Sequence, residues 1–305
     1  MKAVYIEKFG GPEVLKYGDV PDPVAKPGEV VVDVYAASVN GADWKVRAGD
    51  YKQSTFPLGL GRDFSGLVSS VGAGADLKIG DPVFGVLDVG QEGAYAEKLA
   101  IKAAIIARKP DALSHVDAAA LALTGLTALV SVEDTLKLKR GETILIQGGA
   151  GGVAGFAIQL AKHIGARVIT TTSTPNLDYV RSLGPDQVID YKTQDFTKLV
   201  KDVDAVFETV GGDVAMASFS VLKSGGRAAF IASGAKAPTP PRGDVTALRP
   251  AVNRTRPHME RVADLYLKGV VKPPEIKLYG LADIVETQRV SEGRHFRGKL
   301  VFKVR

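Results

Sequence analysis

The chain has 305 residues, of which 45% are hydrophobic and 24% charged, a composition typical of a globular protein with about two domains. It contains no cysteine, which excludes disulfides, thiolate metal sites and cysteine nucleophiles. The formal net charge is +5, but 39 basic residues are interspersed with 34 acidic ones. We therefore expect no nucleic-acid partner, and a surface favourable to anionic small molecules.

Residues 1–122 are predicted to be rich in β-strands. Short apolar runs such as Glu29–Ala36 and Asp81–Val86 are bounded by proline and glycine, as strands and turns usually are. The longest apolar run, Ala118–Val130, is shorter than the roughly 20 residues needed to cross a bilayer. The first residues also lack the pattern of a secretory signal. We expect no membrane span and a cytoplasmic location.

Residues 123–254 have a different pattern, in which apolar strands alternate with helical segments. This alternation is typical of βαβ units with a parallel sheet, and six strands suit a doubly wound sheet. The predicted strands are Thr143–Gln147, Arg167–Thr171, Gln187–Tyr191, Asp204–Thr209, Arg227–Ala232 and Thr246–Val252.

Residues 255–305 are predicted to contain a helix, Met259–Lys268, and a closing strand, Lys299–Val304. We expect this segment to fold back onto the first domain. The predicted fold class is therefore α/β, with a Rossmann domain between two segments that together complete a β-rich domain.

A glycine-rich turn follows the first strand of the second region. Gly149, Gly151 and Ala154 match the G-x-G-x-x-G/A fingerprint of dinucleotide-binding turns. We expect Gly149 to permit the tight turn, Gly151 to let the backbone approach a pyrophosphate, and Ala154 to allow close helix packing. The N–H groups of Gly152 and Val153, at the start of the helix, would bind the phosphates. No Gly-Lys-Ser/Thr follows, so a mononucleotide P-loop is excluded.

The end of the second strand indicates which dinucleotide binds. NAD sites usually place an acidic residue there to hold the ribose 2′-hydroxyl. This chain has hydroxyl and amide side chains instead, in the run Thr170–Asn176. Because such groups can donate to a 2′-phosphate that a carboxylate would repel, the pattern favours NADPH. Thr174 and Pro175 can equally be the N-cap and first residue of a helix, and both interpretations can hold together.

Several stretches together resemble the zinc-free quinone oxidoreductase branch of the medium-chain dehydrogenase/reductase superfamily. They are Met1–Val4, Ser38–Gly49, Gly61–Gly66, Leu123–Leu129, the glycine turn, Val188–Tyr191 and Arg297–Val301. The resemblance implies a GroES-like catalytic domain built from residues 1–122 and 255–305 around a Rossmann domain of residues 123–254. It also implies an active site in the cleft between these domains, and a homodimer.

The resemblance further implies roles for single residues. Zinc-dependent relatives carry a cysteine near Asn40 and a His-Glu pair where this chain has Arg62 and Asp63, so we expect no metal. Thr127 and Val210 would lie near the nicotinamide and its ribose, and Ser173 and Tyr191 near the 2′-phosphate. Asn40, Tyr51, Arg62 and Asp43 would line the substrate cleft, although Asp43 and Asp63 can equally be structural. A lysine that many NADPH-using relatives carry after the second strand is replaced by Pro175 or Leu177.

Without a metal to stabilise an alkoxide, the expected acceptor is one that delocalises charge, such as a quinone or an α,β-unsaturated carbonyl compound. Asn40 and Tyr51 are the candidates for meeting that charge, and water or Tyr51 would supply the proton. Two alternatives remain open: reduction of enoyl thioesters, and a crystallin-like or RNA-binding role that retains the cofactor site.

Overall fold

The structure is a computed structural model that describes residues 1–51 and 55–305. The chain divides into two compact units. Unit 1 comprises Met1–Leu123, Asn253–Leu267 and Pro273–Arg305, whereas unit 2 comprises Thr124–Val252 and Lys268–Lys272. The second unit is thus an insertion into the first. The short piece Lys268–Lys272 belongs to unit 2, a detail that the sequence patterns did not indicate.

Unit 2 contains a six-stranded parallel sheet with the order β11-β10-β9-β12-β13-β14. In order of sequence this is 3-2-1-4-5-6, so the predicted doubly wound Rossmann fold is confirmed. Its strands are β9 (Thr143–Ile146), β10 (Arg167–Thr172), β11 (Gln187–Asp190), β12 (Val203–Glu208), β13 (Leu222–Phe230) and β14 (Thr246–Leu248). Its helices are α3 (Gly152–Ile164), α4 (Leu177–Ser182), α5 (Phe196–Leu199) and α6 (Gly212–Ala217).

The limits of two strands differ from the prediction. β14 ends at Leu248 rather than at Val252, because Pro250 lacks the N–H group that a further ladder bond would need. β13 begins five residues before the predicted Arg227, since Leu222 already pairs with Val203 of β12. Apolar residues such as Leu145, Val206 and Phe230 are buried in the core of this unit.

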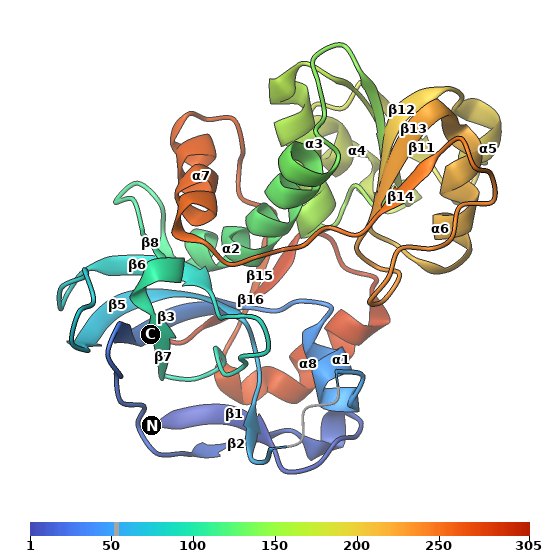
Figure 1. The fold of residues 1–305 in the computed structure, drawn as a ribbon. Helices are drawn as coiled ribbons and strands as arrows, with labels where there is room; N and C mark the ends of the chain where they lie inside the picture. Colours follow the sequence, from blue (N-terminus) through green and yellow to red (C-terminus); the bar gives the residue numbers. More distant parts are fainter. Residues whose placement is uncertain (52–54) are drawn as a thin grey trace. The chain divides into compact units, whose positions relative to one another are not determined.

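Unit 1 is built on a β-sheet in which the two ends of the chain meet. The order is β15-β16-β3-β5-β6-β8, with β7 also paired to β3. The C-terminal strand β16 (Lys299–Lys303) runs antiparallel to β3 (Glu29–Ser38), with Val301 opposite Ser38. The C-terminal segment thus pairs with the first part of the chain, and Figure 1 shows β16 beside β3.

Unit 1 also contains a second β-sheet and several helices. A three-stranded sheet has the order β2-β1-β4. The strands not yet described are β1 (Lys2–Ile6), β2 (Lys16–Asp19), β4 (Leu58–Gly59), β5 (Asp63–Val71), β6 (Pro82–Val86), β7 (Lys98–Lys102), β8 (Ala107–Arg108) and β15 (Ile276–Tyr279). The helices are α1 (Asp43–Ala48), α7 (Arg256–Leu267) and α8 (Ile284–Gly293). Val32, Phe64 and Phe302 are among the fully buried residues of the core.

A long apolar helix begins at His115. It is α-helical over α2 (His115–Leu129) and continues as a π-helix over Val130–Thr135. By length and composition it is apolar enough to cross a membrane, but 78% of its most apolar window is buried inside the protein. Such burial is typical of a core helix.

Candidate functional site

The glycine-rich turn connects β9 to α3. Gly148 has a φ of +75°, so it makes the tight turn that the sequence pattern assigned to Gly149. Gly149 is required for a different reason: a Cβ atom there would lie 2.5 Å from the Thr170 Oγ1 atom. Gly149 thus lets the turn pack against β10, and its N–H donates to the Thr171 carbonyl oxygen at 2.8 Å.

The helix that follows begins as the fingerprint predicts. Gly151 is the N-cap of α3, and the first intrahelical bond runs from the Gly155 N–H to the Gly151 carbonyl oxygen at 2.8 Å. The preceding N–H groups, those of Gly152 and Val153 included, therefore have no partner within the helix. A Cβ on Gly151 would approach only the Gly148 carbonyl oxygen, at 3.4 Å, so the surface outside this residue is open. Open N–H donors at a helix N-terminus fit a dinucleotide pyrophosphate.

The residues expected near a 2′-phosphate lie at the ends of two adjacent strands. β10 and β11 are paired, with Thr172 opposite Asp190, so Ser173 and Tyr191 both follow directly on paired residues. The Ser173 hydroxyl accepts a hydrogen bond from the Asn176 side-chain amide at 3.1 Å and keeps its own hydrogen for another acceptor. The short 3₁₀ helix begins at Thr174, so Ser173, and not Thr174, is its N-cap residue.

A cation lies beside Tyr191. The Lys192 ammonium lies 5.5 Å from the centre of the Tyr191 ring. Sequence reasoning missed this lysine, because it searched for one directly after β10 and not at the end of the neighbouring strand. The nearby carboxylate of Asp190 is already engaged, since it accepts bonds from the Thr174 hydroxyl at 2.6 Å and the Lys192 N–H at 3.0 Å.

The two residues expected at the nicotinamide end lie on separate elements of unit 2. Val210 follows β12 and is 39% exposed. Its N–H and that of Gly211 donate to the Oε1 atom of the buried Glu208, at 2.6 and 2.8 Å. Burial raises the pKa of Glu208, and these two bonds oppose that shift. Thr127 lies in α2, where its carbonyl oxygen accepts a bond from Ser131 at 2.7 Å. Their contacts with a cofactor stay a prediction.

In unit 1, both the nitrogen and the oxygen of the Asn40 side-chain amide form hydrogen bonds. Its amide nitrogen donates to the Asp63 Oδ1 atom at 2.8 Å and to the Ser38 carbonyl oxygen at 3.3 Å. Its oxygen accepts a bond from the ammonium of Lys299 at 2.7 Å. Both amide hydrogens of Asn40 are therefore used inside the protein. Lys299 is buried, and desolvation lowers its pKa.

Arg62 and Tyr51 lie side by side. The Arg62 guanidinium stands over the Tyr51 ring, 5.2 Å from the ring centre, and its Nε donates to Glu92 at 2.6 Å. Asp43 is fully buried and accepts bonds from the Asn40 N–H, at 2.7 Å, and from the Tyr95 hydroxyl. Burial raises the pKa of Asp43 to about 6, although the positive charge of Arg62 acts against the shift. Arg62 thus forms an ion pair with Glu92, lies over the Tyr51 ring, and acts on Asp43 through its charge.

The side chains around Arg62 are a poor donor set for a metal. No group of three or more His, Asp or Glu side chains able to hold a metal ion occurs within residues 1–51 and 55–305. His115, one of the four histidines, has its Nδ1 atom 2.8 Å from the Ser65 hydroxyl, which itself donates to the Val83 carbonyl oxygen. Nδ1 must then carry a hydrogen, and desolvation lowers the pKa of His115 to about 4.

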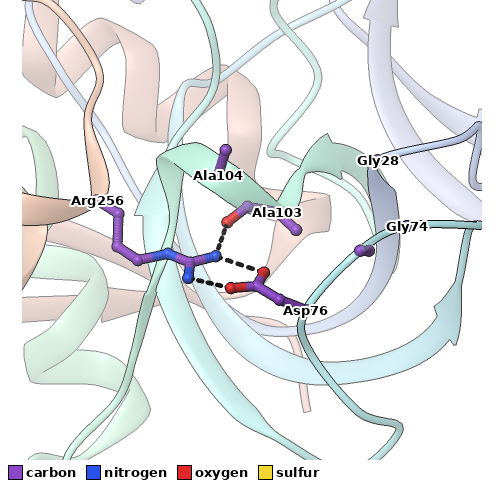
Figure 2. A pocket seen from close by; sticks show the side chains of 7 residues that line it. Gly28, Gly74, Asp76, Ala103, Ala104 and Arg256 are labelled. Carbon is purple, nitrogen blue, oxygen red and sulfur yellow. Dashed lines mark hydrogen bonds and ion pairs between the residues drawn. The ribbon is translucent and has the colours of Figure 1, made fainter.

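Unit 1 also has a pocket of about 370 Å³, lined by Asp76, Ala103 and Arg256 among others (Figure 2). The side chains in this pocket have a structural role. Arg256, at the start of α7, donates to Asp76 at 2.8 Å and to the carbonyl oxygens of Ala103 and Ile106. The Arg256 hydrogen bond lowers the pKa of Asp76 to about 2. Because these donors are engaged, Arg256 joins α7 to the loop between β5 and β6 and to the 3₁₀ turn before β8, and it offers little to a ligand.

Comparisons with known proteins identify the family of this chain. Residues 26–111 match the family model described as alcohol dehydrogenase GroES-like domain, and residues 152–256 match the model described as zinc-binding dehydrogenase. The chain is 36% identical to 2-methylene-furan-3-one reductase from Solanum lycopersicum, over 90% of this chain and 71% of that protein. The chain belongs to the zinc-free quinone oxidoreductase branch of the medium-chain dehydrogenase/reductase superfamily.

The descriptions of two further relatives mention NADPH. The chain is 34% identical to the NADPH-dependent alkenal/one oxidoreductase of Arabidopsis thaliana, a chloroplastic protein, over 90% of this chain and 71% of the relative. The quinone oxidoreductase of Escherichia coli, solved in complex with NADPH, is 28% identical with a TM-score of 0.91, and the match covers 100% of both chains. The resemblance inferred from the sequence, and the predicted GroES-like and Rossmann folds, are thereby confirmed.

Proposed function

We propose that this chain transfers hydride from NADPH to quinones or α,β-unsaturated carbonyl compounds, and that it does so without a metal. The observation that carries the proposal is the Arg62–Tyr51 pair. By the family resemblance, Arg62 and Asp63 occupy the positions of the His-Glu metal ligands of zinc-dependent relatives. The guanidinium uses only its Nε in hydrogen bonds within the described part of the chain. Its terminal N–H groups can therefore donate to an oxygen that gains negative charge.

The reaction needs one hydride and one proton. NADPH, when bound, supplies the hydride. A quinone then becomes a phenolate, and an enone an enolate, whose oxygen Arg62 and the Tyr51 hydroxyl stabilise. The proton comes from water or from Tyr51. Asn40 orients Asp63 and Lys299 instead of donating to the acceptor, because both of its amide hydrogens are engaged.

Cofactor choice rests on unit 2. The helix end at Gly152 and Val153 receives the pyrophosphate, while Ser173, Tyr191 and Lys192 receive the 2′-phosphate. Lys192 supplies the positive charge that is missing directly after β10. Val210 and Thr127 support the nicotinamide and its ribose. A homodimer and a cytoplasmic location complete the proposal; sedimentation and fractionation test these two statements.

The decisive experiment compares kcat/KM for an enone and for its saturated ketone, with NADPH in excess. Because a saturated ketone concentrates the new charge on one oxygen, we expect the enone to react at least about 100-fold faster, comparable to the loss of an oxyanion donor. Activity should survive chelation and dialysis. Equal rates for the two acceptors would overturn the proposal. Turnover of a crotonyl thioester alone, or salt-dependent RNA binding without NADPH oxidation, would favour the two alternative functions.

Tyr51 is tested separately. Tyr51→Phe removes the hydroxyl and keeps the ring beneath Arg62, so kcat should fall about tenfold, as expected for one hydrogen bond to a charged group. The Kd for NADPH should stay unchanged, because Tyr51 lies in unit 1 and the proposed cofactor residues at the pyrophosphate lie in unit 2.

A further inference from the structure

Glu92 is a buried carboxyl group that no sequence motif singled out. It lies on the loop between β6 and β7, and its side chain is 1% exposed. Its Oε1 atom accepts the hydrogen bond from the Arg62 Nε at 2.6 Å. The Arg62 side chain is itself only 16% exposed. A charge-assisted bond of this length between two enclosed groups fixes the direction of the guanidinium plane.

The second oxygen of Glu92 has no partner. Its Oε2 atom is buried without a hydrogen bond, and so is the Oδ1 atom of Asp43. Burial, together with the charge of Asp43, raises the pKa of Glu92 to about 7, against the opposing effect of Arg62 and Arg254. Within the described residues, these charged groups and the Tyr95 hydroxyl bound to Asp43 face Glu92. Glu92 can therefore gain a proton near neutral pH, when its hold on Arg62 weakens.

Resting on the proposed function of Arg62, we propose that Glu92 is a positioning residue that keeps the Arg62 guanidinium over Tyr51 with its terminal N–H groups free for the acceptor oxygen. The ionised carboxylate holds this arrangement through Nε alone. Protonation of Glu92 exchanges an ion pair for a weaker bond and lets the guanidinium turn away. Glu92 does not touch the acceptor, so it acts on the reaction only through Arg62.

The test is a pH profile of kcat and KM for an enone, measured on the full chain at saturating NADPH. In the wild type, kcat should rise about tenfold between pH 6 and pH 8 as Glu92 loses its proton. Glu92→Gln cannot ionise, so its profile should be flat over this range, with kcat at pH 8 about tenfold below the wild type and an unchanged Kd for NADPH. Glu92→Asp keeps a titrating carboxyl group and should keep a rise with pH.

Glu142→Gln is the matched control. Glu142 forms an ion pair with Arg227 at 2.7 Å in unit 2, so its loss removes a comparable pair away from Arg62. The rise in kcat with pH should persist in this variant. If the rise also persists in Glu92→Gln, Glu92 is not the positioning residue, although the proposed function would stand.

A second measurement does not depend on turnover. The ¹⁵N signal of the Arg62 Nε, assigned with Arg62→Gln, should move with pH around neutrality in the wild type and not in Glu92→Gln. A signal that moves in a protein that reduces no enone or quinone would overturn the proposed function and leave the hold of Glu92 on Arg62 intact. A signal that is insensitive to pH in the wild type would overturn the inference itself.

Discussion

The two units bury polar groups of different kinds. Unit 1 buries charged side chains, whereas the polar side chains buried around the turn of unit 2 are mostly uncharged. Buried charged residues of the described part of unit 1 include Asp43, Arg47, Asp63, Lys109 and Lys299. The buried polar residues near the ends of β9, β10, β11 and β12 in unit 2 are Gln147, Thr170, Thr171, Thr172, Asp190 and Glu208.

This difference follows from what each region is proposed to bind. A pyrophosphate brings its own negative charge, so a turn that offers backbone N–H groups among neutral hydroxyls avoids repulsion. Glu208 and Asp190 are the carboxylates among them, and both are engaged. Glu208 accepts hydrogen bonds from the N–H groups of Val210 and Gly211, and Asp190 accepts from the Thr174 hydroxyl and the Lys192 N–H. An uncharged acceptor gains charge only during the reaction, so unit 1 has to hold ready-made charges in fixed directions.

The largest expected effect comes from breaking the charged network of unit 1 at Lys299. Its ammonium donates to the Val39 carbonyl oxygen at 2.6 Å and to Asn40 at 2.7 Å. Lys299→Met leaves Asp63 buried without its counter-charge, so the free energy of unfolding should fall by about 3–5 kcal/mol. Urea denaturation measures this. Lys303→Met, at an exposed position of the same strand, should change it by less than about 0.5 kcal/mol.

The second prediction concerns the pH dependence of stability. The pKa of Glu92 is raised to about 7 in the folded protein, above its ordinary value of 4.5. The folded state therefore binds more protons than the unfolded state between these two values, and stability is lost as the pH rises through them. Relative to Glu92→Gln, the wild type should lose on the order of 3 kcal/mol between pH 4.5 and pH 8. Denaturation curves of both proteins at several pH values test the sign, and a constant difference would contradict it.

A smaller effect is expected from the neutral turn of unit 2. Gly151→Ala adds a Cβ atom that meets only the Gly148 carbonyl oxygen, at 3.4 Å, so the fold should be kept. The methyl group would occupy the space proposed for the pyrophosphate, so the Kd for NADPH should rise at least about tenfold. Calorimetric titration measures it. Gly149→Ala is the contrast, because its Cβ would lie 2.5 Å from Thr170 Oγ1 and should lower the melting temperature.

The smallest predicted effect tests whether unit 2 favours NADPH because its phosphate-binding residues are uncharged or positive. Ser173→Asp introduces a carboxylate beside Tyr191 and Lys192, where it would repel a 2′-phosphate. The ratio of the NADH and NADPH dissociation constants should shift about tenfold towards NADH, roughly 1.4 kcal/mol. Ser220→Asp adds the same charge at an exposed position and should leave the ratio unchanged. Tighter binding of NADH than of NADPH by the wild type would contradict the assignment of NADPH as the cofactor.

The cofactor turn was predictable because its signal is local. Gly149, Gly151 and the apolar helix after them occupy consecutive positions, and the helix ends where expected, with Gly165 at a φ of +91°. Backbone conformation and strand alternation depend on neighbours in sequence, so the Rossmann fold could be recognised from its pattern. The exchange of roles between Gly148 and Gly149 was not visible, since two adjacent glycines carry the same local preference.

The glycine turn and the helix after it could be predicted from the sequence, whereas the hydrogen-bond partners of the buried side chains in unit 1 depend on the tertiary structure. Asn40 and Lys299 are 259 positions apart, and Arg62 and Glu92 are 30 apart. No periodicity links such pairs, so neither the hydrogen bonds of Asn40 nor the proposed role of Glu92 had a sequence signal. The physical reason is that a buried charge depends on its desolvation and on its partners, and both are set by chain segments that meet only on folding.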